Sequence, residues 1–361
     1  MGSPQTWMVT GGAGFIGSNF VLRQVALGTR IVNLDALTYA GNLANLAALG
    51  DDSRHVFARG NINDRGLVAQ LLETHRPTVV VHFAAESHVD RSLVDASSFL
   101  HTNVVGSFAL LDEVARYWRQ LPPELAASFR FVHVSTDEVY GSLGPTDPPF
   151  NETTAYAPNS PYAASKAASD HFVRSYFRTW GLPAITTHCS NNYGPFQFPE
   201  KLIPLMILNA IERKPLPVYG DGCNIRDWLY VEDHCAAIDL VARRGRVGEV
   251  YDIGGAAELA NIDVVESICQ LVDDIAPDGG PARKGLITYV SDRPGHDRRY
   301  AIDHTKLRSE LGWQPAQNFA SGLRRTVQWY FDNAAWTHTV RSGEYRRWLD
   351  TNYTQRPAGS P

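Results

Sequence analysis

The sequence predicts an α/β protein, built on a doubly wound parallel sheet and followed by a smaller, irregular α/β domain. In the first half, short apolar runs alternate with longer amphipathic stretches, which is the pattern of strands connected by helices. Residues 78–83 (TVVVHF) form an apolar run, as expected of a strand buried on both faces. After about Cys189, Pro, Gly, Asn and aromatic residues become frequent between the helical stretches, which indicates the second domain.

Hydrophobic periodicity predicts the elements of the first half. Strands are predicted at residues 6–10, 30–35, 78–83 and 130–135. Helices are predicted at residues 17–26, 65–73, 104–118 and 162–178.

The second half contains helices separated by long irregular connections. They are predicted at residues 202–213, 232–243, 264–276, 305–311 and 319–333. We therefore divide the chain into residues 1–188 and 189–361. No polar linker marks the boundary, so we expect the two parts to pack tightly and later segments to return to the first.

The composition argues against several classes of function. A net charge of -5 is unsuited to a nucleic-acid or anionic membrane surface. No apolar run reaches the roughly 18 residues needed to cross a bilayer, and the N-terminus lacks the regions of a signal peptide. The four cysteines show no CxxC pair and no metal-ligand spacing. We therefore expect reduced thiols, no metal and a cytoplasmic location.

Residues 10–17 (TGGAGFIG) follow the first predicted strand and open the first predicted helix. Gly11 allows the tight turn, Gly14 lets a pyrophosphate approach the backbone, and Gly17 lets the helix pack against the sheet. The pyrophosphate would lie at the positive end of the helix dipole. A glycine motif alone is weak evidence, but its place between a strand and a helix predicts a Rossmann-type, dinucleotide-binding first domain.

The second predicted strand ends in Asp35, at about the distance where an acidic side chain meets the adenosine ribose. A carboxylate there accepts hydrogen bonds from the ribose hydroxyls and repels a 2′-phosphate, which favours NAD over NADP. A solvated aspartate in a turn would explain Asp35 alone, but not the whole pattern.

Tyr162 and Lys166 form a YxxxK pair, whose spacing places both side chains on one helix face. The ordinary pKa of a phenol, about 10, is too high for a base at neutral pH. We expect the Lys166 ammonium and a nicotinamide ring to lower it, so that Tyr162 can deprotonate a substrate hydroxyl. Such pairs are more often ordinary surface residues, but the preceding dinucleotide motif favours catalysis.

Thr136, Asp137 and Glu138 end a buried strand, at the edge where open α/β sheets bind ligands. Three successive polar side chains are costly to bury without a function. They could form a turn whose Asp caps the next segment. As functional groups, they supply a hydroxyl donor and an acid–base pair, which the elimination of water requires.

These motifs resemble the extended short-chain dehydrogenase/reductase superfamily and, within it, the dTDP-glucose 4,6-dehydratase family. The resemblance covers about residues 6–335. It rests on residues 10–17, 34–42 (LDALTYAGN), 82–92 (HFAAESHVDRS), 135–141 (STDEVYG), 162–166 (YAASK), 189–204, 217–234 and 292–303. The Asp137–Glu138 pair distinguishes these dehydratases from epimerases of the superfamily, which need no such pair.

The resemblance implies that dTDP-glucose loses water to give a 4-keto-6-deoxy sugar used in deoxysugar synthesis, such as that of L-rhamnose. Tyr162 would deprotonate the C4 hydroxyl as hydride passes to NAD⁺, while Thr136 binds the C4 oxygen and Lys166 the nicotinamide ribose. Glu138 would then remove the C5 proton, Asp137 would protonate the departing C6 hydroxyl, and the hydride would return to C6.

The resemblance also assigns binding residues in both domains. The cofactor would contact Gly11, Gly14, Phe15, Ile16, Gly17, Asp35, Thr38, Asn61, Ile62, Ala84, Ala85, Tyr162 and Lys166. The sugar nucleotide would contact Ser87, Thr136, Asn191, Glu200, Lys201, Pro217, Tyr219, Arg226, Asn261 and His296. Arg226 and His296 would meet the diphosphate, and Tyr219 would stack on the base. Taken singly, Arg226 could instead pair with Asp227, and Tyr219 could be core.

The chain departs from the family at Asn61, where an acidic residue usually accepts a hydrogen bond from the adenine amino group. The Asn61 carbonyl can also accept this bond, without the charge. We expect a somewhat altered NAD affinity rather than a loss of function.

The resemblance further implies a homodimer, because family members commonly pair through the helices that begin near Asn103 and Tyr162. The first of these carries an apolar stripe of Val105, Phe108, Leu111 and Val114, which could instead face the sheet.

Other functions stay open. The chain could act on another nucleotide sugar, as an epimerase or a different 4,6-dehydratase, or it could be a redox-sensing NAD-binding regulator. A regulator would typically lose Tyr162 or Lys166, and no feature favours a purely structural protein.

Overall fold

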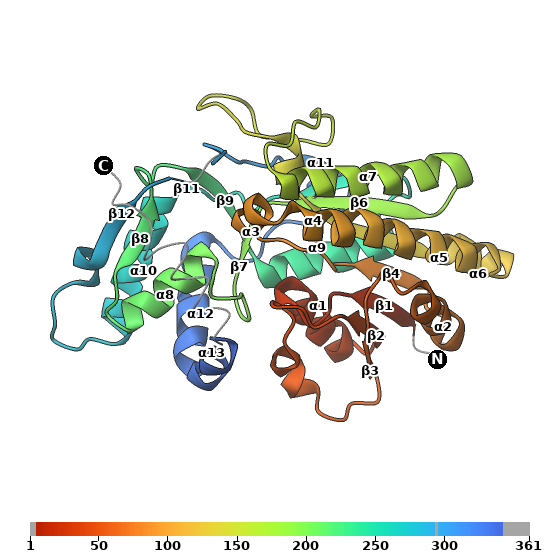
Figure 1. Cartoon of the computed structure of the whole chain (residues 1–361), viewed down its shortest axis with the longest axis horizontal. Coiled ribbons are helices and arrows are strands. Elements are labelled where there is room, and N and C mark those ends of the chain that lie inside the picture. The colour runs from red at the N-terminus through yellow and green to blue at the C-terminus, as the bar shows by residue number, and fades with distance from the viewer. Residues whose placement is uncertain (1–4, 293–294, 342–361) are drawn as a thin grey trace.

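The computed structural model describes residues 5–292 and 295–341, which form two lobes (Figure 1). The larger lobe contains a seven-stranded sheet, and the smaller lobe contains two short sheets with helices from the later part of the chain. Each lobe has its own hydrophobic core. This architecture confirms the predicted fold class.

The strands of the large sheet lie in the order β10-β6-β5-β4-β1-β2-β3, and all neighbours are parallel. Their bounds are β1 Thr6–Thr10, β2 Arg30–Asp35, β3 His55–Arg59, β4 Val79–His82, β5 Arg130–Thr136, β6 Ala184–Cys189 and β10 Val250–Ile253. The order of connection reverses between β1 and β4. In such sheets this reversal opens the crevice where ligands bind.

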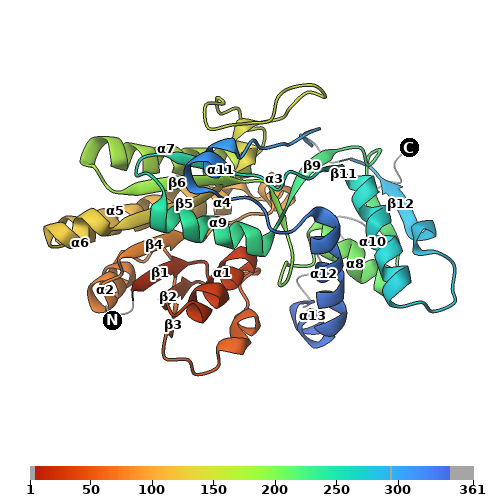
Figure 2. The same ribbon diagram turned by 180° about the vertical axis from the view of Figure 1, so that it is seen from behind.

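Helices cover both faces of this sheet. One face packs against α1, α9 and α11 (Figure 2), and the other against α2, α5 and α7 (Figure 1). Their bounds are α1 Phe15–Ala26, α2 Arg65–His75, α5 Ser107–Arg119, α7 Pro161–Trp180, α9 Val231–Arg244 and α11 Thr305–Leu311. Shorter connecting helices are α3 Val89–Val94, α4 Ala96–Phe99 and α6 Pro123–Ser128, and a π-helical turn, Leu100–Gly106, precedes α5.

The apolar stripe predicted before and along α5 does not form one surface. Leu111 and Val114 are buried against the sheet, whereas Val105 is 47% and Phe108 36% exposed. The π-helical turn changes the helical period at Val105, so the spacing expected for a regular α-helix does not hold across this segment.

The smaller lobe is built from short strands and amphipathic helices around the second core. Its elements are β7 Asn191–Tyr193, β8 Leu216–Tyr219, β9 Ile225–Tyr230, β11 Glu258–Ala260, β12 Ile287–Val290, α8 Leu202–Ile211, α10 Asn261–Ile275, α12 Phe319–Asp332 and α13 Ala334–Val340. No helix in the described part of the chain has the length and apolar character to cross a membrane.

The chain passes between the lobes more than once. α9, β10 and α11 follow the first strands of the smaller lobe, yet all three join the core of the large sheet. The division at residue 188 stays a prediction, and residues 342–361 of the predicted second domain lie outside the described residues.

Candidate active site

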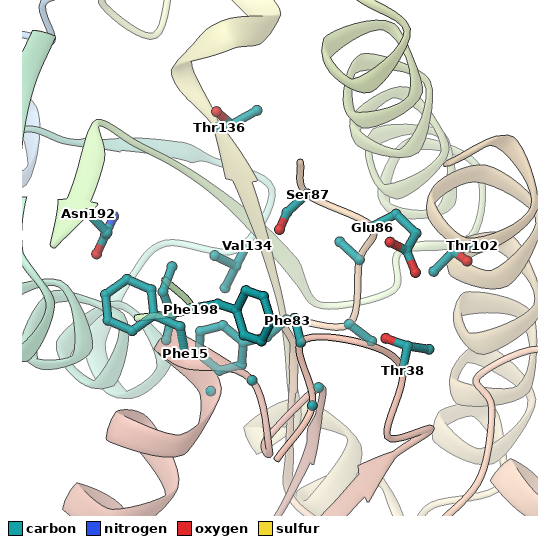
Figure 3. Close-up of a pocket in the computed structure, with 18 of the residues that line it drawn as sticks. Phe15, Thr38, Phe83, Glu86, Ser87, Thr102, Val134, Thr136, Asn192 and Phe198 are labelled. Carbon is teal, nitrogen blue, oxygen red and sulfur yellow. The ribbon is translucent and has the colours of Figure 1, made fainter. Parts of the chain in front are cut away.

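A cavity of about 310 Å³ lies at the carboxyl ends of β1, β4 and β5, at the reversal of strand order. All of the residues predicted to be catalytic and all of those predicted to bind the cofactor line it. Figure 3 shows Phe15, Phe83 and Phe198 gathered on one side of this cavity, with Thr38 and Glu86 on the other. This size is within the range of small-molecule sites, roughly 300–1,000 Å³.

The glycine turn between β1 and α1 forms the floor of the cavity. Gly11 has a φ of +73°, and a Cβ there would lie 2.6 Å from the backbone nitrogen of Ala84. At Gly17 a Cβ would lie 2.1 Å from the carbonyl oxygen of Gly11. A side chain at either position would therefore displace the backbone that lines the cavity, where a dinucleotide would lie.

Asp35 ends β2 beside this turn. Its Oδ2 accepts a hydrogen bond from the Ala13 N–H and its Oδ1 accepts one from the Leu37 N–H, both at 2.8 Å. Burial raises the pKa of Asp35, while these two bonds lower it. A carboxylate has further lone pairs for ribose hydroxyls, so the residues present fit the adenosine half of a dinucleotide.

The carbonyl of Asn61 is already engaged. Its Oδ1 accepts hydrogen bonds from the Asn63 N–H at 2.9 Å and from Asn63 Nδ2 at 3.1 Å. A third donor, such as an adenine amino group, would have to compete with these two.

Tyr162 and Lys166 lie in the first turns of α7, which begins with Ser160 as its cap and Pro161 as its first residue. Lys166 Nζ donates to the Val134 carbonyl at 2.9 Å. Burial, followed by the charge of Glu138, raises the pKa of Tyr162 well above 10, and a hydrogen bond with Thr136 lowers it. Burial therefore acts against the lowered pKa expected of Tyr162, and the nicotinamide ring expected beside it would act in the opposite direction.

Asp137 follows Thr136 in the turn that ends β5 and is only 2% exposed. Thr136 Oγ1 donates to Asp137 Oδ1 at 3.3 Å, while Asp137 Oδ2 has no hydrogen-bond partner among the described residues. Burial, and then the charges of Glu138 and Asp227, raise the pKa of Asp137 well above 3.8. Burial therefore favours the protonated form of Asp137, which is the form that can donate a proton.

Behind the Tyr–Lys pair lies a buried charged group centred on His188. Its Nδ1 lies 3.0 Å from Asp252 Oδ1, and its Nε2 lies 3.1 Å from Asp170 Oδ2. Burial lowers the pKa of His188, but the hydrogen bonds and charges of the two aspartates outweigh burial and raise it to about 10. The resulting imidazolium links β6, β10 and α7, which carries Tyr162.

The predicted substrate residues divide into two groups. Ser87, Thr136, Asn191, Glu200 and Lys201 line the cavity, and Pro217, Tyr219, Arg226, Asn261 and His296 do not.

Arg226 belongs to the second group. It donates to the Asp297 carbonyl at 2.9 Å and lies 4.4 Å from the centre of the Tyr300 ring. The Asp227 carboxylate accepts instead from the N–H groups of Gly255 and Ala257.

Some lining residues were missed by the sequence interpretation, among them Tyr39, Glu86, Asn192, Gln197 and Phe198. Each lies within a segment that carries the resemblance, and three of them directly follow an assigned residue. Within residues 5–292 and 295–341, no group of three or more His, Cys, Asp or Glu side chains could hold a metal ion.

Comparison with known proteins gives consistent results. A family model described as GDP-mannose 4,6 dehydratase matches residues 8–326. The chain is 59% identical over 342 residues to a dTDP-glucose 4,6-dehydratase of Xanthomonas campestris pv. campestris, covering 94% of this chain and 97% of that protein. It is 57% identical over 344 residues to the dTDP-glucose 4,6-dehydratase of Neisseria meningitidis serogroup B, with the same coverage.

Solved structures agree. DesIV, a dTDP-glucose 4,6-dehydratase from Streptomyces venezuelae solved with NAD and TYD bound, superposes with a TM-score of 0.84 at 46% identity. The match covers 93% of this chain and 100% of that one. The dTDP-glucose 4,6-dehydratase of Bacillus anthracis, in complex with NAD, gives a TM-score of 0.83 at 47% identity, covering 93% of this chain and 99% of that one.

Proposed function

This chain belongs to the GDP-mannose 4,6 dehydratase family, and from that premise we propose that it is an NAD-dependent hydro-lyase that converts dTDP-glucose to dTDP-4-keto-6-deoxyglucose and water. The observation that carries the proposal is the buried carboxyl of Asp137, whose Oδ2 has no hydrogen-bond partner among the described residues and which lines the same cavity as Glu138 and Tyr162. An epimerase needs only the Tyr–Lys pair, whereas loss of water also needs a proton donor and a base.

The glycine turn, Asp35 and Lys166 would hold the cofactor. When bound, NAD⁺ accepts a hydride from C4 of the sugar and returns it to C6. The positively charged ring also favours the phenolate of Tyr162, which burial alone disfavours.

The side chains then supply the proton transfers. Tyr162 takes the proton of the C4 hydroxyl, and the resulting C4 ketone acidifies the C5 proton, which Glu138 removes. Asp137 gives its proton to the C6 hydroxyl, which leaves as water. Glu138 returns its proton to C5, and the proton gained by Tyr162 balances the one lost by Asp137.

The nucleotide would extend from the cavity toward the smaller lobe. Tyr219 and Arg226 lie on β8 and β9, the strands of this lobe that carry an aromatic ring and a guanidinium suited to a base and a diphosphate. This placement supports a sugar nucleotide that bridges the two lobes.

We also propose that the chain forms a homodimer in the cytoplasm. Phe108 and Phe172 are exposed on α5 and α7, with ring centres 5.6 Å apart. Leu100 and Val105 are exposed on the π-helical turn before α5, and Trp180 is exposed at the end of α7. A second copy would bury this surface in a contact of four helices. The four cysteines are free thiols, which suits a reducing compartment.

The test is incubation of the purified protein with dTDP-glucose and no added NAD. We expect each enzyme molecule to turn over many times, because the cofactor ends in its starting oxidation state. The product should have the mass of the substrate less one water. Parallel incubation with UDP-glucose tests whether the enzyme distinguishes the thymine base from uracil. Turnover that stops after one cycle, or an epimer of unchanged mass, would contradict the proposal.

A further inference from the structure

Contacts between the two lobes lie in and beside the cavity wall, and the proton transfers do not use them. The loop after β4 and the start of α3 face the segment before α8. Lys201 Nζ donates to the Ser87 carbonyl at 3.0 Å, and Arg91 Nη2 donates to Glu200 Oε2 at 3.1 Å. Tyr219 of β8 donates to Asp90 Oδ2 at 3.2 Å.

Arg91 contacts two segments that are distant from it in the sequence. Its guanidinium carbon lies 3.8 Å from the centre of the Tyr39 ring, in the loop after β2, and its Nε lies 3.3 Å from Glu200 Oε2. The Tyr39 ring in turn meets Phe198 edge-on, with centres 5.7 Å apart. Tyr39, Phe198 and Glu200 all line the cavity. Arg91 therefore joins the adenosine side of the cavity to the segment before α8.

The contact between Arg91 and Glu200 depends on charge as well as on packing. Glu200 is only 3% exposed, and burial raises its pKa while nearby Lys201 and Arg91 lower it. A buried carboxylate that loses a partner is strongly unfavourable. Glu86 adds a second carboxylate close to Arg91 and Glu200. Loss of Arg91 would remove one of the partners that offset the burial of Glu200.

We propose that Arg91 is a positioning residue that pins Glu200 and Tyr39 together, closing the cavity wall over bound NAD. The identity of the cofactor rests on the function proposed above. Because that reaction restores the cofactor in each cycle, a wall that stays closed between turnovers costs no activity. A loosened wall would let the cofactor escape.

The test compares Arg91→Gln with the unaltered chain. NAD is counted per chain after gel filtration, and its dissociation rate is measured directly. We expect dissociation to be faster by about tenfold or more, as for loss of a charged hydrogen-bond pair. Turnover should become dependent on added NAD, with kcat at saturating NAD largely kept. Arg91→Lys, which keeps the charge but not the planar contact, should restore retention in part.

Arg325→Gln is the matched control. Arg325 also lies over a tyrosine ring, Tyr230 at 5.4 Å, and pairs with a carboxylate, Glu232 at 3.4 Å, but none of these residues lines the cavity. We expect this variant to keep its NAD.

The outcomes separate the two proposals. If Arg91→Gln keeps NAD as tightly as the control while the unaltered chain dehydrates dTDP-glucose, the role of Arg91 is overturned. If NAD is lost but the unaltered chain does not dehydrate dTDP-glucose, the closing contact stands and the proposed function falls. Should Arg91→Gln not fold, Tyr39→Leu decides, because it removes the ring under the guanidinium. Unchanged NAD dissociation in that variant would overturn the proposal.

Discussion

The Asp137→Asn substitution exchanges an acid for an amide of nearly the same shape, and we expect it to have opposite effects on catalysis and stability. The amide can still accept the Thr136 hydrogen bond at Oδ1, but it cannot give a proton to a leaving hydroxyl. General acid catalysis contributes about 100-fold to 10,000-fold. Formation of the 4-keto-6-deoxy product should fall by a factor in this range, with bound NAD unchanged.

The effect on stability follows from the raised pKa of Asp137. Above pH 3.8, the unfolded chain loses this proton while the folded chain keeps it, so the acid destabilises the fold as the pH rises. The penalty grows by about 1.4 kcal/mol for each pH unit, up to the raised pKa. Asparagine does not titrate and removes the penalty. The variant should therefore gain stability over the unaltered chain between about pH 5 and about pH 7.

Urea unfolding at these two pH values, together with product formation, measures both effects. Asp221→Asn is the control, because the exposed Asp221 pairs with Arg298 and its pKa is lowered to about 2. The small contribution of the Asp221–Arg298 pair to the free energy of unfolding is present above the pKa of Asp221 in the unfolded chain and is lost only in acid. An Asp137→Asn variant whose stability relative to the unaltered chain is the same at both pH values would refute the raised pKa of Asp137. Near-normal product formation would refute the proton donor.

Three other substitutions test separate parts of the molecule. Glu138→Gln should slow elimination by about 100-fold or more while sugar oxidation continues, so the absorbance of reduced nicotinamide should rise transiently; an unaffected dehydration rate removes Glu138 from its role. His188→Phe leaves Asp170 and Asp252 buried without their cation and should lower the free energy of unfolding by about 3–5 kcal/mol. Because the folded pKa of His188 is raised to about 10, its contribution to the free energy of unfolding is complete below pH 6.5 and disappears as the pH rises through about 10. The stability difference between the variant and the unaltered chain should therefore become smaller over this pH range, and urea unfolding that shows a constant difference contradicts the imidazolium. Phe108→Asp should weaken self-association by about tenfold or more, measured by light scattering over a dilution series. A variant whose molar mass falls on dilution no earlier than that of the unaltered chain would place the dimer contact elsewhere.

The sequence predicts correctly those strands whose central positions are mostly apolar. β1 and β2 begin and end at the predicted residues because their side chains are buried almost throughout. β6 was not predicted, since Thr186, Thr187 and His188 are polar although all are buried. Their burial depends on partners from other elements, such as Asp170 and Asp252, which periodicity does not show.

In the candidate site, too, local features could be predicted from the sequence and contacts between distant residues could not. The glycine turn and the Tyr162–Lys166 pair are local patterns, and spacing alone places each set on one turn or one helix face. The contact of Arg91 with Glu200 joins residues 109 positions apart and depends on how the two lobes meet. The raised pKa of Asp137 likewise depends on burial and on Asp227 of the smaller lobe, not on its neighbours in the sequence alone.

The position of β10 at the edge of the large sheet bears on how the protein is made. β6 has its second neighbour only when residues 250–253 have been synthesised, more than sixty residues after β6 itself. Until then a nascent chain presents β6 as an open edge, with His188 lacking Asp252. The sheet of the first lobe therefore cannot be completed during translation before part of the second lobe, including α8, β8 and β9, has been synthesised. Within the described residues, the chain leaves the large lobe before its sheet is complete and returns to that sheet with β10.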